Sequence, residues 1–123
     1  MKKIMSFNKL AGKEIGNYQS MSAYYTKIMR TDEQVNMGII YIESGGLVGY
    51  HEAPVAQAFI VMEGKGWIKG ADKLKQAIQA GEGVLWEKGE GHESGSEEGM
   101  TVLILQGESL PLEERELLYA TNQ

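Results

Sequence analysis

The chain has 123 residues, of which 42% are apolar and 24% charged, with a formal net charge of −5 and no cysteine. This composition is typical of one globular domain, and it excludes a disordered chain, a disulfide framework and thiol chemistry. The acidic balance, with arginine only at Arg30 and Arg115, argues against a phosphate-backbone partner, so we expect no nucleic-acid binding.

No apolar run is long enough to cross a membrane, and the segment after Met1–Ser6 lacks the apolar stretch of a signal peptide. We therefore expect no membrane association and a cytoplasmic location. Glycine is abundant, with 16 residues against two prolines, which favours frequent tight turns and hence an all-β architecture.

The first third of the chain predicts an arm followed by two strands. Residues 1–20 carry scattered apolar side chains without a sustained period, and we interpret them as an arm that packs on the barrel or on a partner. Ser22–Arg30 is rich in aromatic and β-branched residues, which predicts a strand. Val35–Glu43 alternates as a second strand, and both of its faces become apolar toward its end, which predicts burial between two layers or at a subunit interface.

The central segment shows the clearest alternation. Gln57 and Phe59 fall on one face of a strand, and counting backwards places His51 and Ala53 on the same face if the strand is unbroken at Pro54. Two polar groups that can each bind a metal or a ligand, His51 and Gln57, would then face the same space.

The last third predicts further strands. Lys73–Ala80 fits a strand or a short capped helix, and we favour the strand because glycines follow within one turn. Val84–Glu87 predicts a short strand, Glu87–Gly99 a polar loop with a short polar strand, and Met100–Gln106 the strongest strand of the chain. Pro111–Ala120 predicts a closing helix with proline at its first position. Short strands at this spacing indicate a β-sandwich or barrel.

Two glycine and histidine patterns carry a family resemblance. The first reads G-x5-H-x-A-x3-Q-x6-G from Gly45 to Gly64, and the second reads G-x5-E-x-G-x2-H-x3-S from Gly81 to Ser96. They resemble the two motifs of the cupin superfamily, G-x5-H-x-H-x3/4-E-x6-G and G-x5-P-x-G-x2-H-x3-N. Ala53 and Gln57 replace the second histidine and the glutamate of the first motif.

The resemblance implies an all-β fold, a cupin-type double-stranded β-helix, which is an antiparallel jelly-roll barrel, with a short C-terminal helix. It divides the chain into an arm at 1–20, a barrel at 21–110, and a helix and tail at 111–123. It also implies a homodimer, and Ile40, Ile42, Leu103 and Leu105 offer a second apolar face for that contact.

The resemblance further implies a metal site, because the family's ligands come from these motif positions. Carried onto this chain they are His51, Gln57 and His92, for a divalent transition metal such as Mn, Fe, Ni or Zn. A glutamine ligand adds no charge and Ala53 removes a ligand, so any metal should be weakly held. The missing acid at Ala53 argues against the facial triad of 2-oxoglutarate oxygenases.

Aromatic residues predict the walls of a ligand pocket, with Tyr41, Phe59 and Trp86 as the best candidates. Most aromatic residues of a small domain pack in its core, and that alternative stays open for each of them. No nucleophile elbow, P-loop or dinucleotide fingerprint is present in the sequence.

Three functions remain open at this stage. The chain could be a cupin that binds a small molecule in its barrel, with or without a metal. It could instead be a metal-dependent isomerase, lyase or dioxygenase that uses His51, Gln57 and His92. The third alternative is an assembly module with a vestigial site, since the fold alone does not define an activity.

Overall fold

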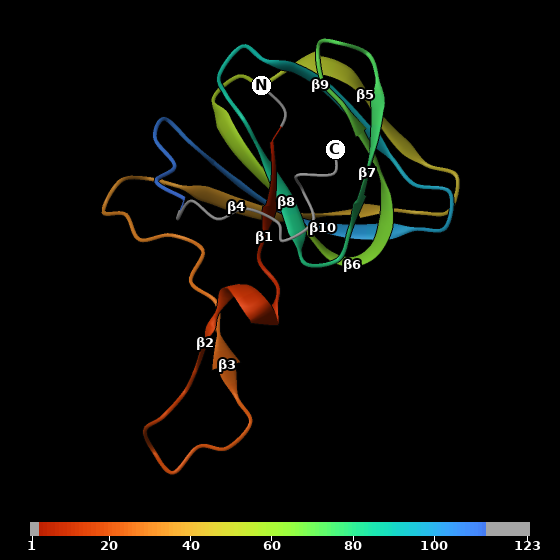
Figure 1. Ribbon diagram of the computed structural model, residues 1–123. Coiled ribbons are helices and arrows are strands. Elements are labelled where there is room, and N and C mark those ends of the chain that lie inside the picture. The colour runs from red at the N-terminus through yellow and green to blue at the C-terminus, as the bar shows by residue number, and fades with distance from the viewer. Residues whose placement is uncertain (1–2, 113–123) are drawn as a thin grey trace.

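The computed structural model describes residues 3–112, which fold into two antiparallel β-sheets with a hairpin arm that projects away from them (Figure 1). In chain order the elements are β1 (Ile4–Ser6), a 3-10 helix (Lys9–Ala11), β2 (Lys13–Glu14), β3 (Tyr24–Tyr25), β4 (Asn36–Ile42), β5 (Leu47–Glu52), β6 (Ala56–Lys69), β7 (Lys75–Gln79), β8 (Glu82–Trp86), β9 (Gly91–Gly95) and β10 (Met100–Gly107).

The long strand β6 connects the two layers of the jelly roll. Its first part pairs with β8 and β10, within the order β1-β8-β6-β10-β4. Its second part, Lys65–Lys69, pairs with β7 and β9, and β9 pairs in turn with β5. Gly64 separates the two parts with a φ of +82°, a conformation that glycine adopts without strain. The turn at this glycine lets one strand serve both sheets.

The barrel interior is filled from both sheets. Its hydrophobic cluster includes Phe59, Val84 and Ile104 from the first sheet and Ile68 and Ile78 from the second. Each of these side chains is at most 4% exposed, as expected for inward positions of alternating strands. Burial of such side chains is the main stabilising contribution in a domain of this size.

A second cluster lies on the outer face of the first sheet. Ala58, Ile60 and Leu105 are buried there, and the segments before and after the barrel strands cover them with partly buried side chains such as Phe7 and Met29. This face therefore explains why Leu103 and Leu105 are apolar. Ile40 and Ile42, which the sequence placed with them, instead pack into the barrel interior.

The predicted strands are confirmed at β4, β7, β8, β9 and β10, with boundaries shifted by a few residues. The expected strand at Ser22–Arg30 is reduced to the two residues of β3, which pair with β2 in the hairpin arm. The expected arm at 1–20 begins with β1, which pairs with β8. The expected helix at Pro111–Ala120 lies outside the described residues from 113 on, and Leu112 forms an isolated antiparallel bridge with Met29. Within residues 3–112, no helix has the length and apolar character needed to span a membrane.

Candidate functional site

The two histidines of the chain meet at one end of the barrel. His51 on β5 and His92 on β9 are directly opposite each other in the antiparallel register, and their ring centroids are 4.5 Å apart. Directly opposite side chains point to the same side of a sheet, so the register itself brings the imidazoles together. The two motif histidines are 41 residues apart in the sequence, and strand pairing brings them together.

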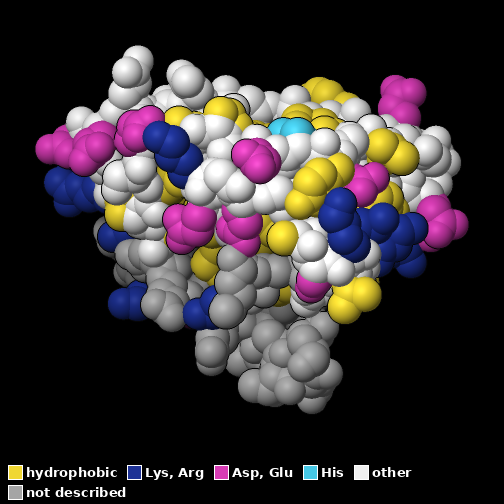
Figure 2. All heavy atoms as spheres, turned by 90° about the horizontal axis from the view of Figure 1, so that it is seen from above, with side chains coloured by type: hydrophobic (Ala, Val, Ile, Leu, Met, Phe, Trp, Pro, Cys, Tyr) yellow, Lys and Arg dark blue, Asp and Glu magenta, His cyan; other side chains and the backbone are white. Residues whose placement is uncertain are grey.

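Trp86 lies behind this pair. Its indole ring stacks on the His92 ring, with centroids 4.9 Å apart and planes 7° from parallel. Trp86 is 1% exposed and His92 is 3% exposed, whereas His51 is exposed. The three rings thus form a series from the barrel interior to the surface, and Figure 2 shows histidine atoms at that surface beside apolar side chains.

Backbone carbonyl oxygens determine which ring nitrogen of each histidine carries the hydrogen. His51 Nδ1 lies 2.8 Å from the Gly49 carbonyl oxygen, and His92 Nδ1 lies 3.1 Å from the Glu90 carbonyl oxygen. A carbonyl only accepts, so each Nδ1 carries the hydrogen and donates it. In the neutral rings both Nε2 atoms then keep a lone pair, which is the form that binds metals or accepts a proton.

The surroundings of His92 favour its neutral form. Burial lowers the pKa of His92, and the nearby charge of His51 lowers it further, against the opposing effects of the Glu90 backbone and carboxylate. These effects therefore favour the neutral ring, whose Nε2 carries a lone pair.

The predicted third ligand comes from the other sheet. The chain is not extended between the end of β5 and the start of β6, so His51 and Gln57 do not share one continuous strand. Gln57 lies directly opposite Trp86 on β8 and shares the inward face of β6 with Phe59. The strand break thus places the two predicted ligands on facing sheets.

Ala53 fills a core position where the family's motif has a histidine. It is 2% exposed and packs with Trp86 in the interior cluster. Among residues 3–112, no group of three or more His, Cys, Asp or Glu side chains could hold a metal ion. These donors could therefore bind an ion only through two imidazoles, with an amide oxygen or water completing its coordination. Such a set of ligands binds a divalent ion weakly.

Two polar groups near this site were not predicted from the sequence. Gln106 on β10 lies directly opposite Gln57, and both are partly buried. The Nε1 atom of Trp86 is buried and has no hydrogen-bond partner within the described residues. Because Val102, Ile104 and Gln106 alternate along β10, the sequence could have predicted that Gln106 points inward. That the indole N–H has no partner can be seen only in the tertiary structure.

The three predicted pocket residues do not line one common pocket. Phe59 and Trp86, 2% and 1% exposed, both lie in the interior cluster, and Trp86 stacks on His92. Tyr41 is 69% exposed and lies on the opposite face of its sheet, where it contributes to a separate hollow. The structure therefore joins Trp86 to the imidazole pair, keeps Phe59 in the same interior cluster as Trp86, and places Tyr41 elsewhere.

The arrangement defines the class of fold as an antiparallel double-stranded β-helix. Solved structures of cupin proteins share this fold. A cupin-like protein from Thermotoga maritima matches with a TM-score of 0.58 and 22% identity, over 71% of each chain. A cupin-2 domain protein from Shewanella frigidimarina matches with a TM-score of 0.53 and 25% identity, over 65% of this chain and 76% of that one.

An enzyme structure also shares the fold. A DMSP lyase from Ruegeria pomeroyi matches with a TM-score of 0.55 and 17% identity, over 72% of this chain and 45% of that one. No protein-family profile and no curated protein sequence matches the chain. The cupin fold is therefore shown by structural likeness, as the two sequence motifs indicated.

Proposed function

We propose that this chain is a small-molecule-binding cupin whose ligand contacts His51 at the surface end of the ring series. The observation that carries the proposal is the imidazole pair itself, in which each Nδ1 lies against a backbone carbonyl oxygen, so that Nε2 carries the lone pair of the neutral ring, and one ring is exposed. The unpaired Trp86 Nε1 adds a hydrogen-bond donor behind the pair.

A divalent ion is a weakly held component of this proposal. His51 and His92 would bind it through Nε2, and Gln57 is the candidate for a neutral oxygen ligand. Imidazole donors suit Zn and Ni better than Mn, which prefers oxygen ligands. When bound, the ion would supply a positive charge that attracts an acceptor group of the ligand.

A metal-dependent lyase or isomerase is the second candidate. It is supported by the buried His92, whose Nε2 carries the lone pair of the neutral ring and could accept a proton in such a reaction. The similarity in fold to the DMSP lyase is compatible with this candidate and does not define the substrate.

The first test is elemental analysis of the untagged protein before and after incubation with Mn, Fe, Ni or Zn salts, beside His51→Ala and His92→Ala. We expect substoichiometric metal in the purified protein and uptake of Zn or Ni that both variants lose. A protein that takes up none of the four ions would remove the metal and the enzyme candidate together.

The second test measures ligand binding without reference to metal. The chain has two tryptophans, so its ¹H–¹⁵N spectrum should contain two indole signals, and Trp67→Phe assigns them. A library of small acids, amides and sugars that bind at the proposed site should shift the Trp86 indole signal and leave the Trp67 signal in place. A library that shifts neither signal would contradict the proposal.

A further inference from the structure

The outer face of the second sheet carries two aromatic rings that lie over glycines of β9. Trp67 on β6 is directly opposite Gly95, and a Cβ at Gly95 would collide with the indole ring. A Cβ at Gly91 would collide in the same way with the Tyr50 side chain. Because His92 faces the interior, both glycine positions belong to the outer face, and they are buried there since the rings cover them.

A β-bulge turns Tyr50 toward this face. The register shifts between Val48 and His51, where two residues of β5 stand opposite one residue of β9. Val48 packs against the interior cluster, so strict alternation would turn Tyr50 inward and His51 outward. The extra residue reverses this, as bulges re-aim the side chains that follow them. Tyr50 is therefore 42% exposed on the outside of the barrel.

A lysine ammonium group lies on each ring. Lys73 Nζ is 3.7 Å from the centroid of the Tyr50 ring, and Lys75 Nζ is 4.4 Å from the centroid of a ring of Trp67. Lys73 has a φ of +65° in the turn between β6 and β7, which is an uncommon conformation for a residue with a side chain. Ammonium contacts with exposed rings are weak, so a ligand can take the place of the ammonium group on either ring.

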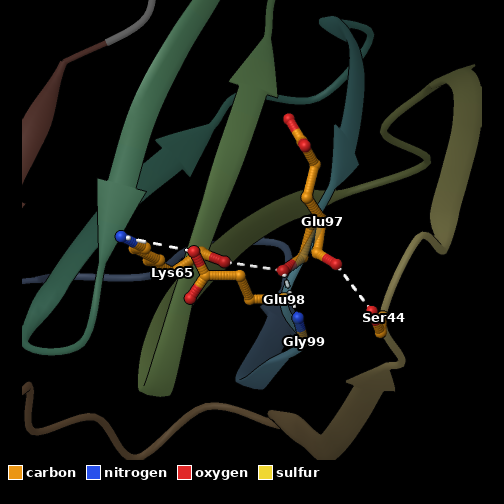
Figure 3. Close-up of polar contacts among 6 residues, drawn as sticks. Ser44, Lys65, Glu97, Glu98 and Gly99 are labelled. Atoms are coloured by element: carbon orange, nitrogen blue, oxygen red, sulfur yellow. Dashed lines mark hydrogen bonds and ion pairs between the residues drawn. The ribbon is translucent and has the colours of Figure 1, made fainter.

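These two lysines differ from the other lysines on the same face. Lys65 lies 3.5 Å from Glu98, as Figure 3 shows, and Lys69 lies 3.7 Å from Glu93. Within residues 3–112, the two lysines on the rings have no carboxylate partner of this kind. The face therefore offers two ammonium groups, each beside an aromatic ring, to an anionic ligand.

We propose that this face binds an acidic oligosaccharide, with sugar rings on Trp67 and Tyr50 and carboxylates at Lys75 and Lys73. The C–H groups of a sugar ring pack on the negative face of an aromatic ring, and a sugar carboxylate pairs with an ammonium group. The two glycines under the rings are four residues apart on one strand, which is about 13 Å. The ligand is therefore a chain of several sugars.

A nucleic acid fits the same face less well. Nucleic-acid grooves combine stacking rings with positive charges that follow the phosphate of every nucleotide. Here Glu93 lies on the outer side of β9 between the two covered glycines, and its carboxylate would repel a phosphate backbone. The same carboxylate accepts hydrogen bonds from sugar hydroxyls. The histidines lie on the other side of this strand, so the inference does not depend on the proposed function.

Titration of the ¹⁵N-labelled chain with hyaluronan hexasaccharide, which carries a carboxylate on every second sugar, tests the proposal. The indole signal of Trp67 reports on the outer face, and the indole signal of Trp86 reports on the histidine site at the same time. We expect the hexasaccharide to shift the Trp67 signal saturably and to leave the Trp86 signal in place. The neutral hexamer of N-acetylglucosamine should bind about tenfold more weakly or not at all.

Three single variants test the role of the lysines. Lys73→Gln and Lys75→Gln each remove one ammonium group from a ring, and we expect each to weaken binding of the hexasaccharide by about three- to fivefold. Lys13→Gln is the matched control, because it removes the same charge at an exposed position of β2 outside this face. We expect the control to leave the dissociation constant unchanged. An equal loss in all three variants would mean general attraction by charge and would overturn the proposal.

Other outcomes of the titration would also overturn it. A Trp67 signal that the hexasaccharide does not move would mean that the rings bind no sugar chain. A shift of the Trp86 signal alone would place the sugar chain at the histidine site, which would support the proposed function and not this surface. Equal binding of the neutral hexamer would remove the role of the carboxylates. Tighter binding of an oligothymidylate would make the face a nucleic-acid surface.

Discussion

Trp86 and His92 stack face to face in the barrel interior, with ring centroids 4.9 Å apart and planes 7° from parallel. The stack joins the two sheets, because Trp86 belongs to β8 and His92 to β9. It fixes the plane of the buried imidazole, whose Nδ1 is fixed separately by the Glu90 carbonyl. The orientation of His92 is therefore set by one apolar contact and one hydrogen bond, both independent of any ligand.

The first prediction concerns the polar atom of this stack. Trp86→Phe keeps an aromatic ring on His92 and removes an N–H that has no partner within the described residues. We expect it to lower the free energy of unfolding by less than about 1.5 kcal/mol, and Trp86→Ala to lower it by about 3–5 kcal/mol. Urea unfolding of the two variants measures the difference. Equal losses would mean that a phenylalanine ring does not replace the packing of the indole ring on His92.

The second prediction concerns the missing charge at the candidate metal site. Gln57→Glu restores the residue type of the family's motif without changing the size of the side chain. We expect about a tenfold or greater gain in Zn or Ni affinity by calorimetry, because a carboxylate adds a charged oxygen ligand. Gln106→Glu is the matched control, since it places a carboxylate on the adjacent strand opposite Gln57. An equal gain in both variants would indicate general attraction by negative charge instead of coordination.

Much of the fold could be predicted because its local signals agree. Glycines end the strands at regular distances, and alternation is strong in segments such as Met100–Gln106, where the structure has β10. The two motifs also predicted that His51 and His92 approach each other, and they are in direct register. Local patterns and the global fold point to the same answer in these segments.

The errors occur where a local pattern has two solutions. Both faces of β4 are apolar, so alternation could not decide whether Tyr41 or Ile42 faces the interior, and the structure buries Ile42. Similarly, alternation could be counted through Ala53 and Pro54 only if the strand continued, and the chain instead changes sheets there. The Ser22–Arg30 segment has high strand propensity, yet only Tyr24 and Tyr25 find a partner strand.

The third prediction concerns the turn that lets β6 serve both sheets. Gly64 has a φ of +82°, and a Cβ at this position would collide with the carbonyl oxygen of Gly99. We expect Gly64→Ala to lower the free energy of unfolding by about 2 kcal/mol or more, because both the backbone conformation and the neighbouring backbone oppose a side chain. Thermal and urea unfolding measure the loss.

Gly38→Ala provides the control for this variant. Gly38 lies within β4, and a Cβ there would meet no atom within 4 Å. We expect a change of less than about 0.5 kcal/mol, with a slight gain favoured by the lower flexibility of alanine in the unfolded chain. Similar losses in the two variants would mean that the turn at Gly64 does not depend on glycine.

The fourth prediction concerns Glu82, which lies opposite Ser6 in the pairing of β8 with β1 and is 5% exposed. Burial raises the pKa of the Glu82 carboxyl, and the hydrogen bond that it accepts from the Gln79 backbone opposes this only in part. The folded state therefore holds the proton more tightly than the unfolded state. The contribution of this group to stability is fully present below the unfolded pKa and is lost as the pH rises through the folded pKa. Above the folded pKa the ionised carboxylate opposes folding.

Glu82→Gln tests this sign, because glutamine stays neutral at every pH and its oxygen can still accept the Gln79 hydrogen bond. We expect the variant to melt a few degrees above the parent protein at pH 7, and the difference to shrink toward zero as the pH falls below the ordinary pKa of glutamate. Glu108→Gln, at an exposed position, makes the same change in net charge and should leave the melting temperature nearly unchanged. A Glu82→Gln protein that melts below the parent at pH 7 would show that the charged carboxylate stabilises the β1–β8 pairing, which is the opposite of the effect that burial predicts.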